Sequence, residues 1–202
     1  MRVSGTIALT LDDGPDPLWT APLLGALRES GARATFFVIT PNAVANPDLI
    51  EAMHADGHEV GFHCLRHIRH AQQSEGELTG DLTAGLHQLQ SVGVFPRAWR
   101  APWGRETEVT RRLAIRHGLR LWGWNLDSHD WRGDSAAQMY TAIVAQGGLR
   151  NGDVVLMHDG LGPGAKRTGC EETLELTRLL IAEAAHEGLS LAPLSECQGV
   201  LA

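Results

Sequence analysis

The fold of this chain follows from residues 5–15, which read Gly-Thr-Ile-Ala-Leu-Thr-Leu-Asp-Asp-Gly-Pro. Residues 5–11 are apolar apart from two threonines, a composition that predicts a buried strand. Asp12-Asp13-Gly14-Pro15 then ends the strand, because these residue types form turns. Two adjacent carboxylates are therefore expected at the carboxyl end of a strand that lies inside the protein.

Strands and helices alternate along the rest of the chain. The sequence predicts helices at residues 18–30, 46–56, 77–90, 106–117, 136–146 and 171–187, and further strands at 33–39, 58–62, 98–100, 120–124, 153–157 and 189–192. This alternation indicates βα units around a parallel sheet. About seven units in 202 residues predict one α/β domain over residues 1–202, an incomplete (β/α) barrel of parallel strands in which some helices are short or missing.

Composition excludes several classes of protein. The formal net charge of -7 argues against a nucleic-acid partner, since phosphate binding requires a basic surface. No apolar run approaches the ~18–20 residues of a membrane span. The N-terminus lacks the apolar segment of a signal peptide, so we expect a cytoplasmic protein, or an extracellular one if the N-terminus was trimmed. Three cysteines, an odd number, do not make a disulfide framework.

Residues able to carry out chemistry stand where five of the expected strands end. They are Asp12 and Asp13, His63 and His67, the segment 100–104, the segment 127–131, and His158. Taken alone, each is more common as a turn, a surface ion pair or a structural histidine. In a parallel barrel, however, the carboxyl ends of all strands open on one face, where active sites lie. Their shared position therefore predicts that they converge on one site.

These residue types suit metal-assisted hydrolysis. A divalent metal of borderline softness accepts imidazole and carboxylate together, and two histidines with one aspartate leave coordination positions open. Hydrolysis also requires a base for water and an acid for the leaving group. Asp12 and Asp13 can supply a base and a ligand from adjacent positions. His158, from a different strand, is the candidate acid.

Five motifs between Thr10 and His158 resemble, in order, those of the polysaccharide deacetylase family, also called the NodB-homology domain or carbohydrate esterase family four. They are the segments 10–15 (TLDDGP), 63–67 (HCLRH), 100–104 (RAPWG), 127–131 (DSHDW) and 156–158 (LMH). The resemblance covers most of the chain. It implies a distorted (β/α) barrel, in agreement with the alternation of strands and helices.

The resemblance also implies a role for each residue of the first three motifs. Asp12 is expected to be the catalytic base, and Arg100 to orient it. Asp13, His63 and His67 are expected to bind a divalent metal. Zinc is the default for two histidines and one aspartate, and cobalt or nickel would fit the same ligands.

The remaining roles concern the acid and the substrate. The resemblance implies that His158 is the catalytic acid and that Asp127 tunes it. The backbone N–H of Trp103 is expected to help hold the oxyanion. Trp131 is expected to line the substrate groove, and Leu156 to contact the acetyl methyl group.

Two residues depart from the family pattern. Leu11 stands where the family usually has Phe, a conservative apolar exchange. Cys64 stands where the family usually has Ser or Thr, so a hydroxyl that would bond a neighbouring loop is missing beside His63. A sharper hypothesis makes Cys64 an additional metal ligand.

The function expected from these motifs is removal of N-acetyl groups from N-acetylated amino sugars of the chitin or peptidoglycan type. A second possibility is a cytoplasmic deacylase of a small acetylated metabolite or antibiotic precursor, which the missing signal peptide favours. A third is a sugar-binding domain without catalysis. The intact acid, base and ligand residues count against the third, because a binding module needs no acid–base pair.

Overall fold

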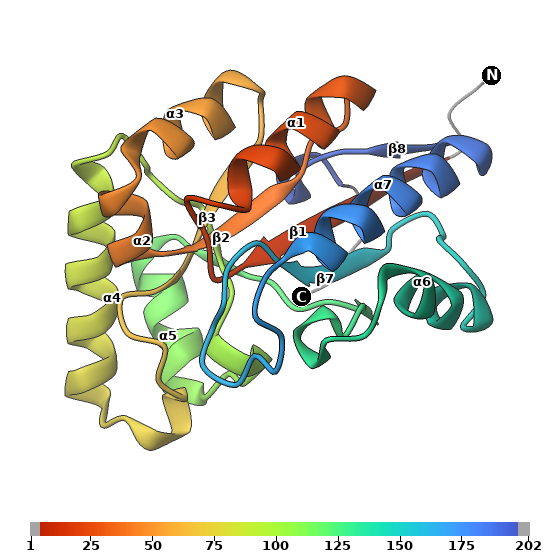
Figure 1. The fold of residues 1–202 in the computed structure, drawn as a ribbon. Coiled ribbons are helices and arrows are strands. Elements are labelled where there is room, and N and C mark those ends of the chain that lie inside the picture. The colour runs from red at the N-terminus through yellow and green to blue at the C-terminus, as the bar shows by residue number, and fades with distance from the viewer. Residues whose placement is uncertain (1–4, 198–202) are drawn as a thin grey trace.

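The computed structural model describes residues 5–197, so residues 1–4 and 198–202 of the expected domain lie outside the described residues. Strands and helices alternate throughout (Figure 1). The strands are β1 (Gly5–Asp12), β2 (Thr35–Ile39), β3 (Glu59–Cys64), β4 (Ala98–Trp99), β5 (Arg120–Leu121), β6 (Leu126–Asp127), β7 (Val154–His158) and β8 (Leu189–Leu191). The α helices are α1 (Thr20–Ser30), α2 (Thr40–Ala45), α3 (Pro47–Ala55), α4 (Glu75–Gln90), α5 (Glu108–His117), α6 (Ala136–Ala145) and α7 (Glu171–His186).

The eight described strands form one parallel sheet. Its order is β5-β4-β3-β2-β1-β7-β6, and β8 pairs with the first half of β1 while β2 pairs with the second half. β5 and β6 follow each other in the chain but lie at opposite ends of this order, so the sheet stays open between them. The helices pack around the outside of the curved sheet (Figure 1). This half-barrel in a single domain confirms the incomplete parallel barrel predicted from the sequence.

Alternation along β1 assigns its side chains to two faces. Leu9 and Leu11 are fully buried in the main core cluster, which also contains apolar residues of α1 and α7. Ala8 belongs to a second, smaller cluster on the inner face of the half-barrel. Because the side-chain period of a strand is two, Thr10 and Asp12 share the inner face with Ala8. The outer face of β1 therefore anchors the helices, and its inner face leads to the acidic end of the strand.

The strand expected at residues 120–124 is broken in the structure. β5 ends at Leu121, and the chain then crosses to the other end of the sheet, where it forms β6. Between them, the carbonyls of Trp122 and Gly123 accept hydrogen bonds from Nε and NH2 of Arg100, at 3.3 and 2.8 Å. Two carbonyls of this segment thus accept hydrogen bonds from the buried guanidinium of Arg100, and β5 ends just before them.

Helix α2 was not predicted from the sequence. It covers Thr40–Ala45, directly before α3, where the sequence predicted a single helix at residues 46–56. Both helices carry a proline in their first turn. Proline is favoured at that position because the first backbone N–H of a helix has no partner within the helix. The two prolines mark two helix starts, whereas the sequence predicted only the second helix, at residues 46–56.

Replacing a side chain in the centre of the main core should destabilise the whole domain. We predict that Leu9→Ala lowers the free energy of unfolding by ~2–5 kcal/mol, because it removes buried methyl groups and leaves a cavity. Leu18→Ala makes the same chemical change at a side chain that is 72% exposed, and it should change the value by less than ~0.5 kcal/mol. Urea unfolding of both variants measures the difference, and equal stabilities would contradict this description of the core.

Candidate active site

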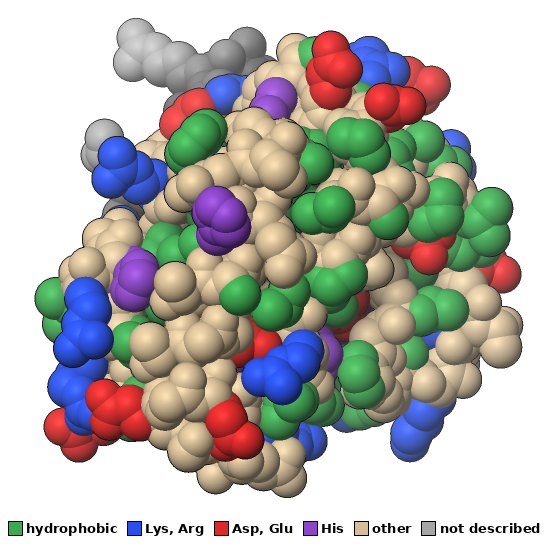
Figure 2. All heavy atoms as spheres, turned by 90° about the vertical axis from the view of Figure 1, so that its left-hand side faces the viewer, with side chains coloured by type: hydrophobic (Ala, Val, Ile, Leu, Met, Phe, Trp, Pro, Cys, Tyr) green, Lys and Arg blue, Asp and Glu red, His purple; other side chains and the backbone are tan. Residues whose placement is uncertain are grey.

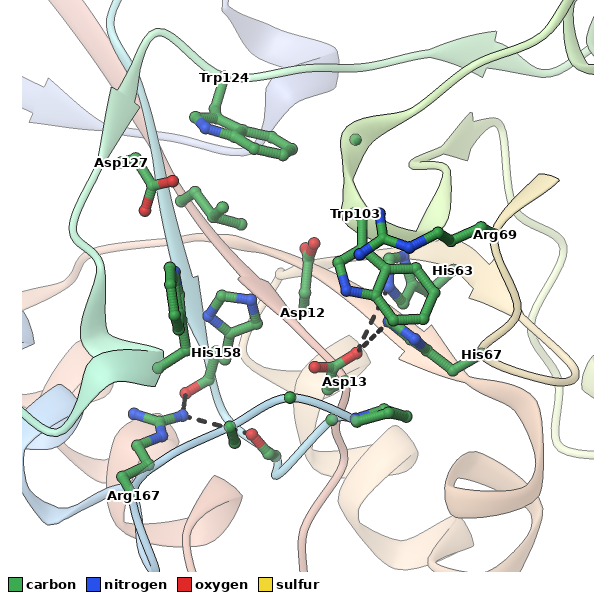
Figure 3. A pocket seen from close by; sticks show the side chains of 18 residues that line it. Asp12, Asp13, His63, His67, Arg69, Trp103, Trp124, Asp127, His158 and Arg167 are labelled. Atoms are coloured by element: carbon green, nitrogen blue, oxygen red, sulfur yellow. Dashed lines mark hydrogen bonds and ion pairs between the residues drawn. The ribbon is translucent and has the colours of Figure 1, made fainter. Parts of the chain in front are cut away.

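The carboxyl ends of the central strands bring the candidate base and acid together. Parallel pairing aligns Asp12 of β1 with His158 of β7. These strand ends open into a pocket of about 380 Å³ (Figure 3). Nine of the ten residues singled out from the sequence line it: Asp12, Asp13, His63, His67, Trp103, Asp127, Trp131, Leu156 and His158. The tenth, Arg100, is fully buried against Asp12.

Asp13, His63 and His67 form a cluster with the composition of a metal site. One ligand atom of each lies within 4.8 Å of the others. Asp13 Oδ1 is 3.4 Å from Nε2 of His63 and 3.3 Å from Nε2 of His67, and this buried oxygen has no hydrogen-bond partner among the described residues. Ligands at ~2.1 Å from a tetrahedral zinc lie ~3.4 Å apart. The three atoms therefore fit around one cation.

The charge and orientation of these ligands also suit a metal. Burial alone raises the pKa of Asp13, but the imidazoles of His63 and His67 outweigh burial and hold the pKa well below its usual range. Nδ1 of His63 bonds the backbone carbonyl of Arg100 at 2.8 Å. Since Nδ1 is the donor in this bond, Nε2 keeps its lone pair for a metal.

Helix α4 fixes the loop between the two histidines. Its residue Asp81 is buried and accepts hydrogen bonds from the backbone N–H groups of Leu65 and Arg66, at 3.1 and 3.0 Å. These bonds set the course of the chain from His63, on β3, to His67 in the loop that follows. The side chain of a neighbouring helix therefore determines the spacing of two ligands.

Cys64 is not part of the metal-ligand cluster found among the described residues. Its side chain is only 2% exposed, and burial raises the pKa of its thiol well above the usual value. A neutral, buried thiol packs as a small apolar side chain. Cys64 therefore fills space beside the ligands, and the hypothesis of a fourth ligand finds no support in the geometry.

Arg100 holds Asp12 from inside the half-barrel. Its NH1 donates to Asp12 Oδ1 at 2.9 Å and to Thr10 Oγ1 at 2.7 Å. Both charged side chains are almost completely buried, and the guanidinium also stacks on Phe37, 4.3 Å from the ring centre. Breaking a buried ion pair by removing one partner costs ~3–5 kcal/mol, because the other charge is left uncompensated. Asp12 is thereby fixed in one orientation at the pocket.

The partner of His158 differs from the residue expected. Asp127 was expected to tune His158, but its Oδ1 accepts a hydrogen bond from the backbone N–H of His129 at 2.8 Å. Asp130 instead accepts from Nδ1 of His158 at 2.7 Å and from the backbone N–H of His158 at 2.9 Å. The reason is local: the chain turns through a left-handed conformation at His129, which directs Asp130 inward under β7. The expectation for Asp127 is therefore corrected to Asp130.

The contact between His158 and Asp130 changes the charge of both groups. Burial acts against each charged form, but the opposite charge of the partner outweighs it. The pKa of His158 is raised to about 9, and that of Asp130 is lowered to about 2. At neutral pH the imidazole is therefore a cation with a proton to give, as a general acid requires.

The backbone is strained at three points of this site. Asp13, Trp103 and His129 have φ angles of 74°, 55° and 57°, and they are the non-glycine residues with positive φ among those described. Residues with side chains adopt this region at a cost, and such residues cluster at functional sites. Each of the three belongs to a motif singled out from the sequence, so the strain lies where side chains or N–H groups must face the pocket.

Four residues of the site were missed in the sequence analysis. Trp124, at the end of the strand expected at residues 120–124, lines the pocket because β5 ends before it. Arg69 and Arg167 also line the pocket, and Asp130 contacts the acid. A lone arginine in a loop gives no signal of its own, whereas the second carboxylate of the 127–131 motif was visible and could have been weighed.

Comparison with known proteins gives the same family as the motifs. The family model described as polysaccharide deacetylase matches residues 2–122. A chitooligosaccharide deacetylase from Bradyrhizobium sp. (strain ANU 289) is 32% identical, with 96% of this chain and 92% of the relative covered. A peptidoglycan-N-acetylglucosamine deacetylase from Bacillus cereus is 33% identical, with 76% and 72% covered.

Solved structures share the fold of this chain. A family 4 acetyl xylan esterase from Clostridium thermocellum, solved with a cobalt ion, superposes with a TM-score of 0.81 at 25% identity. The match covers 95% of this chain and 89% of the esterase. With the half-barrel, the family match and the curated relatives in agreement, this chain belongs to the polysaccharide deacetylase family and is a hydrolase of carbon–nitrogen bonds other than peptide bonds.

Proposed function

We propose that this enzyme is a metal-dependent hydrolase that removes N-acetyl groups from amino sugars of chitooligosaccharides or peptidoglycan, giving acetate and a free amine. One observation carries the proposal: Asp12 and His158 are aligned on neighbouring strands, beside a cluster of metal-ligand side chains. The names of the relatives from Bradyrhizobium and Bacillus cereus support the two classes of glycan.

Hydrolysis of an acetamide moves two protons, one from water and one to the nitrogen. Asp12, held in place by Arg100, accepts a proton from the attacking water. The water oxygen bonds to the carbonyl carbon, with the backbone N–H of Trp103 as a donor to the oxyanion. The carbon–nitrogen bond then breaks, and Nε2 of His158 gives its proton to the departing nitrogen. Because Nδ1 is bonded to Asp130, Nε2 is the nitrogen available to the pocket.

We propose zinc as the metal, because it is the default for two histidines and one aspartate. Asp13, His63 and His67 would hold the ion and leave positions open, as in catalytic zinc sites. When bound, such an ion polarises the acetyl carbonyl and lowers the pKa of water. Cobalt or nickel would fit the same donors, and the relative from Clostridium thermocellum was solved with cobalt.

The walls of the pocket suit an N-acetylated sugar. Trp124 and Trp131 line it with aromatic rings, on which sugar rings can stack, whereas the ring of Trp103 already contacts Arg69 and His67. Leu156 lies in the lining but is only 4% exposed, so it presents a small apolar surface for an acetyl methyl group. A site with aromatic walls and a few fixed polar groups is typical of a small-molecule or sugar pocket.

No helix among the described residues has the length and apolar character to cross a membrane. On the face drawn in Figure 2, acidic and basic side chains are interspersed, and the absence of a nucleic-acid partner stays a prediction. A cytoplasmic location stays a prediction.

The two proton-transfer residues should be separable from metal binding. We predict that Asp12→Asn and His158→Ala each lower the kcat for acetate release by ~10²–10⁴-fold, because each removes one proton transfer. Neither variant loses a metal ligand, so both should retain zinc when metal content is measured after dialysis. His67→Ala is the matched control, and it should lose the metal as well as activity. Near wild-type turnover in either of the first two variants would contradict the assigned role.

The dependence of kcat on pH should show the pKa of the candidate acid, His158. His158 must be protonated to donate, so kcat should fall as the pH rises through about 9. Asp130→Asn removes the negative charge that raises this pKa, and the alkaline limb should move to lower pH by ~1–3 units. Asp127→Asn is the control and should leave the limb in place. If the alkaline limb moved in Asp127→Asn and not in Asp130→Asn, Asp127 and not Asp130 would be the residue that tunes His158.

The reaction itself is tested by acetate release from a panel of substrates, with and without a chelator. We predict release from chitin oligomers or peptidoglycan fragments, loss of release with the chelator, and recovery on adding zinc. Free amines, counted in parallel, should match the acetate. Preference for monosaccharide acetamides would indicate the small-metabolite enzyme, and sugar binding without acetate release by the metal-loaded protein would indicate a binding domain.

A further inference from the structure

Arg167 has no role in the mechanism described so far, although its surroundings are unusual for an arginine in a loop. It stands in the glycine-rich segment 160–169, between β7 and α7. It lines the pocket, yet its side chain is only 5% exposed. A buried guanidinium is costly unless its donors are satisfied. The identity of its partners therefore indicates what it does.

The guanidinium of Arg167 bonds the acid from two sides. NH1 donates to Asp130 Oδ2 at 3.0 Å, and NH2 donates to the backbone carbonyl of His158 at 2.8 Å. NH1 also donates to Thr173 Oγ1, on α7, which in turn donates to Asp130 Oδ2 at 2.7 Å. Figure 3 shows Arg167 beside His158 on one wall of the pocket. One side chain thus holds both the carboxylate partner and the backbone of the acid.

The two carboxylate oxygens of Asp130 have different hydrogen-bond partners. Oδ2 accepts from Arg167, Thr173 and the backbone N–H of His158, and Oδ1 accepts from the imidazole. With Oδ2 accepting three hydrogen bonds, the carboxylate cannot rotate away from Nδ1 without leaving buried donors unpaired, which is unfavourable. The imidazole is therefore held with Nε2 toward the pocket.

Arg167 also bonds the glycine-rich segment 160–169 in which it stands, so a second role, that of holding this loop, must be distinguished from the first. NH2 donates to the carbonyl of Gly160 at 3.3 Å, and the loop then passes over Asp13. At Gly162 there is no room for a side chain, since a Cβ atom would overlap the Asp13 carboxylate. If Arg167 served only to hold this loop, its loss would disturb the metal ligand and every reaction of the site equally.

We propose that Arg167 is a positioning residue for the general acid, holding Asp130 and the His158 backbone so that Nε2 of His158 is aimed at the leaving nitrogen. This inference rests on the proposed deacetylase function. It differs from the loop role in a measurable way, because a residue that acts through the acid matters only when the leaving group needs a proton.

Two substrates separate these cases. In an acetamide the carbon–nitrogen bond breaks, and the departing nitrogen must receive the proton of His158. In 4-nitrophenyl acetate the carbon–oxygen bond breaks, and 4-nitrophenolate leaves as a stable anion without a proton. Both reactions use the same water, base and metal site, and both release acetate. A defect confined to the acid therefore lowers the rate on the amide and spares the ester.

The experiment compares kcat and KM of Arg167→Gln on a chitin oligomer and on 4-nitrophenyl acetate, with zinc-loaded protein. We expect kcat on the amide to fall ~10–100-fold, with changes of less than ~3-fold in its KM and in the rate on the ester. His158→Ala should show the same selectivity, and the double variant should be no worse than His158→Ala alone, since residues acting through one group are not additive. Arg178→Gln, an exposed position on α7, is the control and should change neither rate.

Equal losses on amide and ester, or no loss on either, would overturn the inference. If Arg167→Gln does not fold, Arg167→Lys and Thr173→Val provide the same comparison, because each removes part of the support of Asp130. We expect the same selectivity from both, with smaller amide losses. Absence of acetate release from every N-acetylated sugar by the wild-type enzyme would overturn the proposed function and this inference together. An active wild type with unselective variants would overturn the inference alone.

Discussion

A guanidinium buried inside the half-barrel ties together the parts of the site that the chain supplies from different strands. Arg100 bonds Asp12 and Thr10 of β1 with one nitrogen, and the carbonyl of Gly123, in the gap between β5 and β6, with another. Its own carbonyl accepts from the imidazole of His63. Since a buried charge is tolerated only when its donors are satisfied, these segments are fixed relative to one another. Arg100 therefore links the site to the segment where the sheet stays open.

The candidate base and the candidate acid are each supported by a buried arginine that bonds a carboxylate. For the base this carboxylate is Asp12 itself, and for the acid it is the partner of His158. Arg100 presents a cation directly to Asp12, whereas Arg167 acts on His158 through the carboxylate of Asp130. One intervening carboxylate is enough to make the histidine a cation, with a pKa raised to about 9. The imidazole of His158 and the carboxylate of Asp12, which is paired with Arg100, therefore lie on neighbouring strands in one pocket, as the proposed acid–base pair requires.

Much of the fold and most of the site followed from the sequence, because both depend on a simple rule. Parallel strands end on one face, so polar residues after buried strands converge, and nine of ten chosen residues line the pocket. The exceptions depend on local backbone geometry. The left-handed turn at His129 decides between Asp127 and Asp130, and the carbonyl contacts of Arg100 end β5 early, which brings Trp124 to the pocket. Neither the turn at His129 nor the carbonyl contacts of Arg100 produce a pattern in composition or periodicity.

Chain segments far apart in the sequence meet at a cluster of metal-ligand side chains, and we propose that this cluster holds one metal ion beside an acid–base pair. Anomalous diffraction from crystals of this protein grown with zinc tests it most directly, since the ion is located without any assumption about activity. We expect a single strong peak in the pocket, shared by Asp13 Oδ1 and by Nε2 of His63 and His67. A pocket without a peak, or an ion held without Asp13, would contradict the claim.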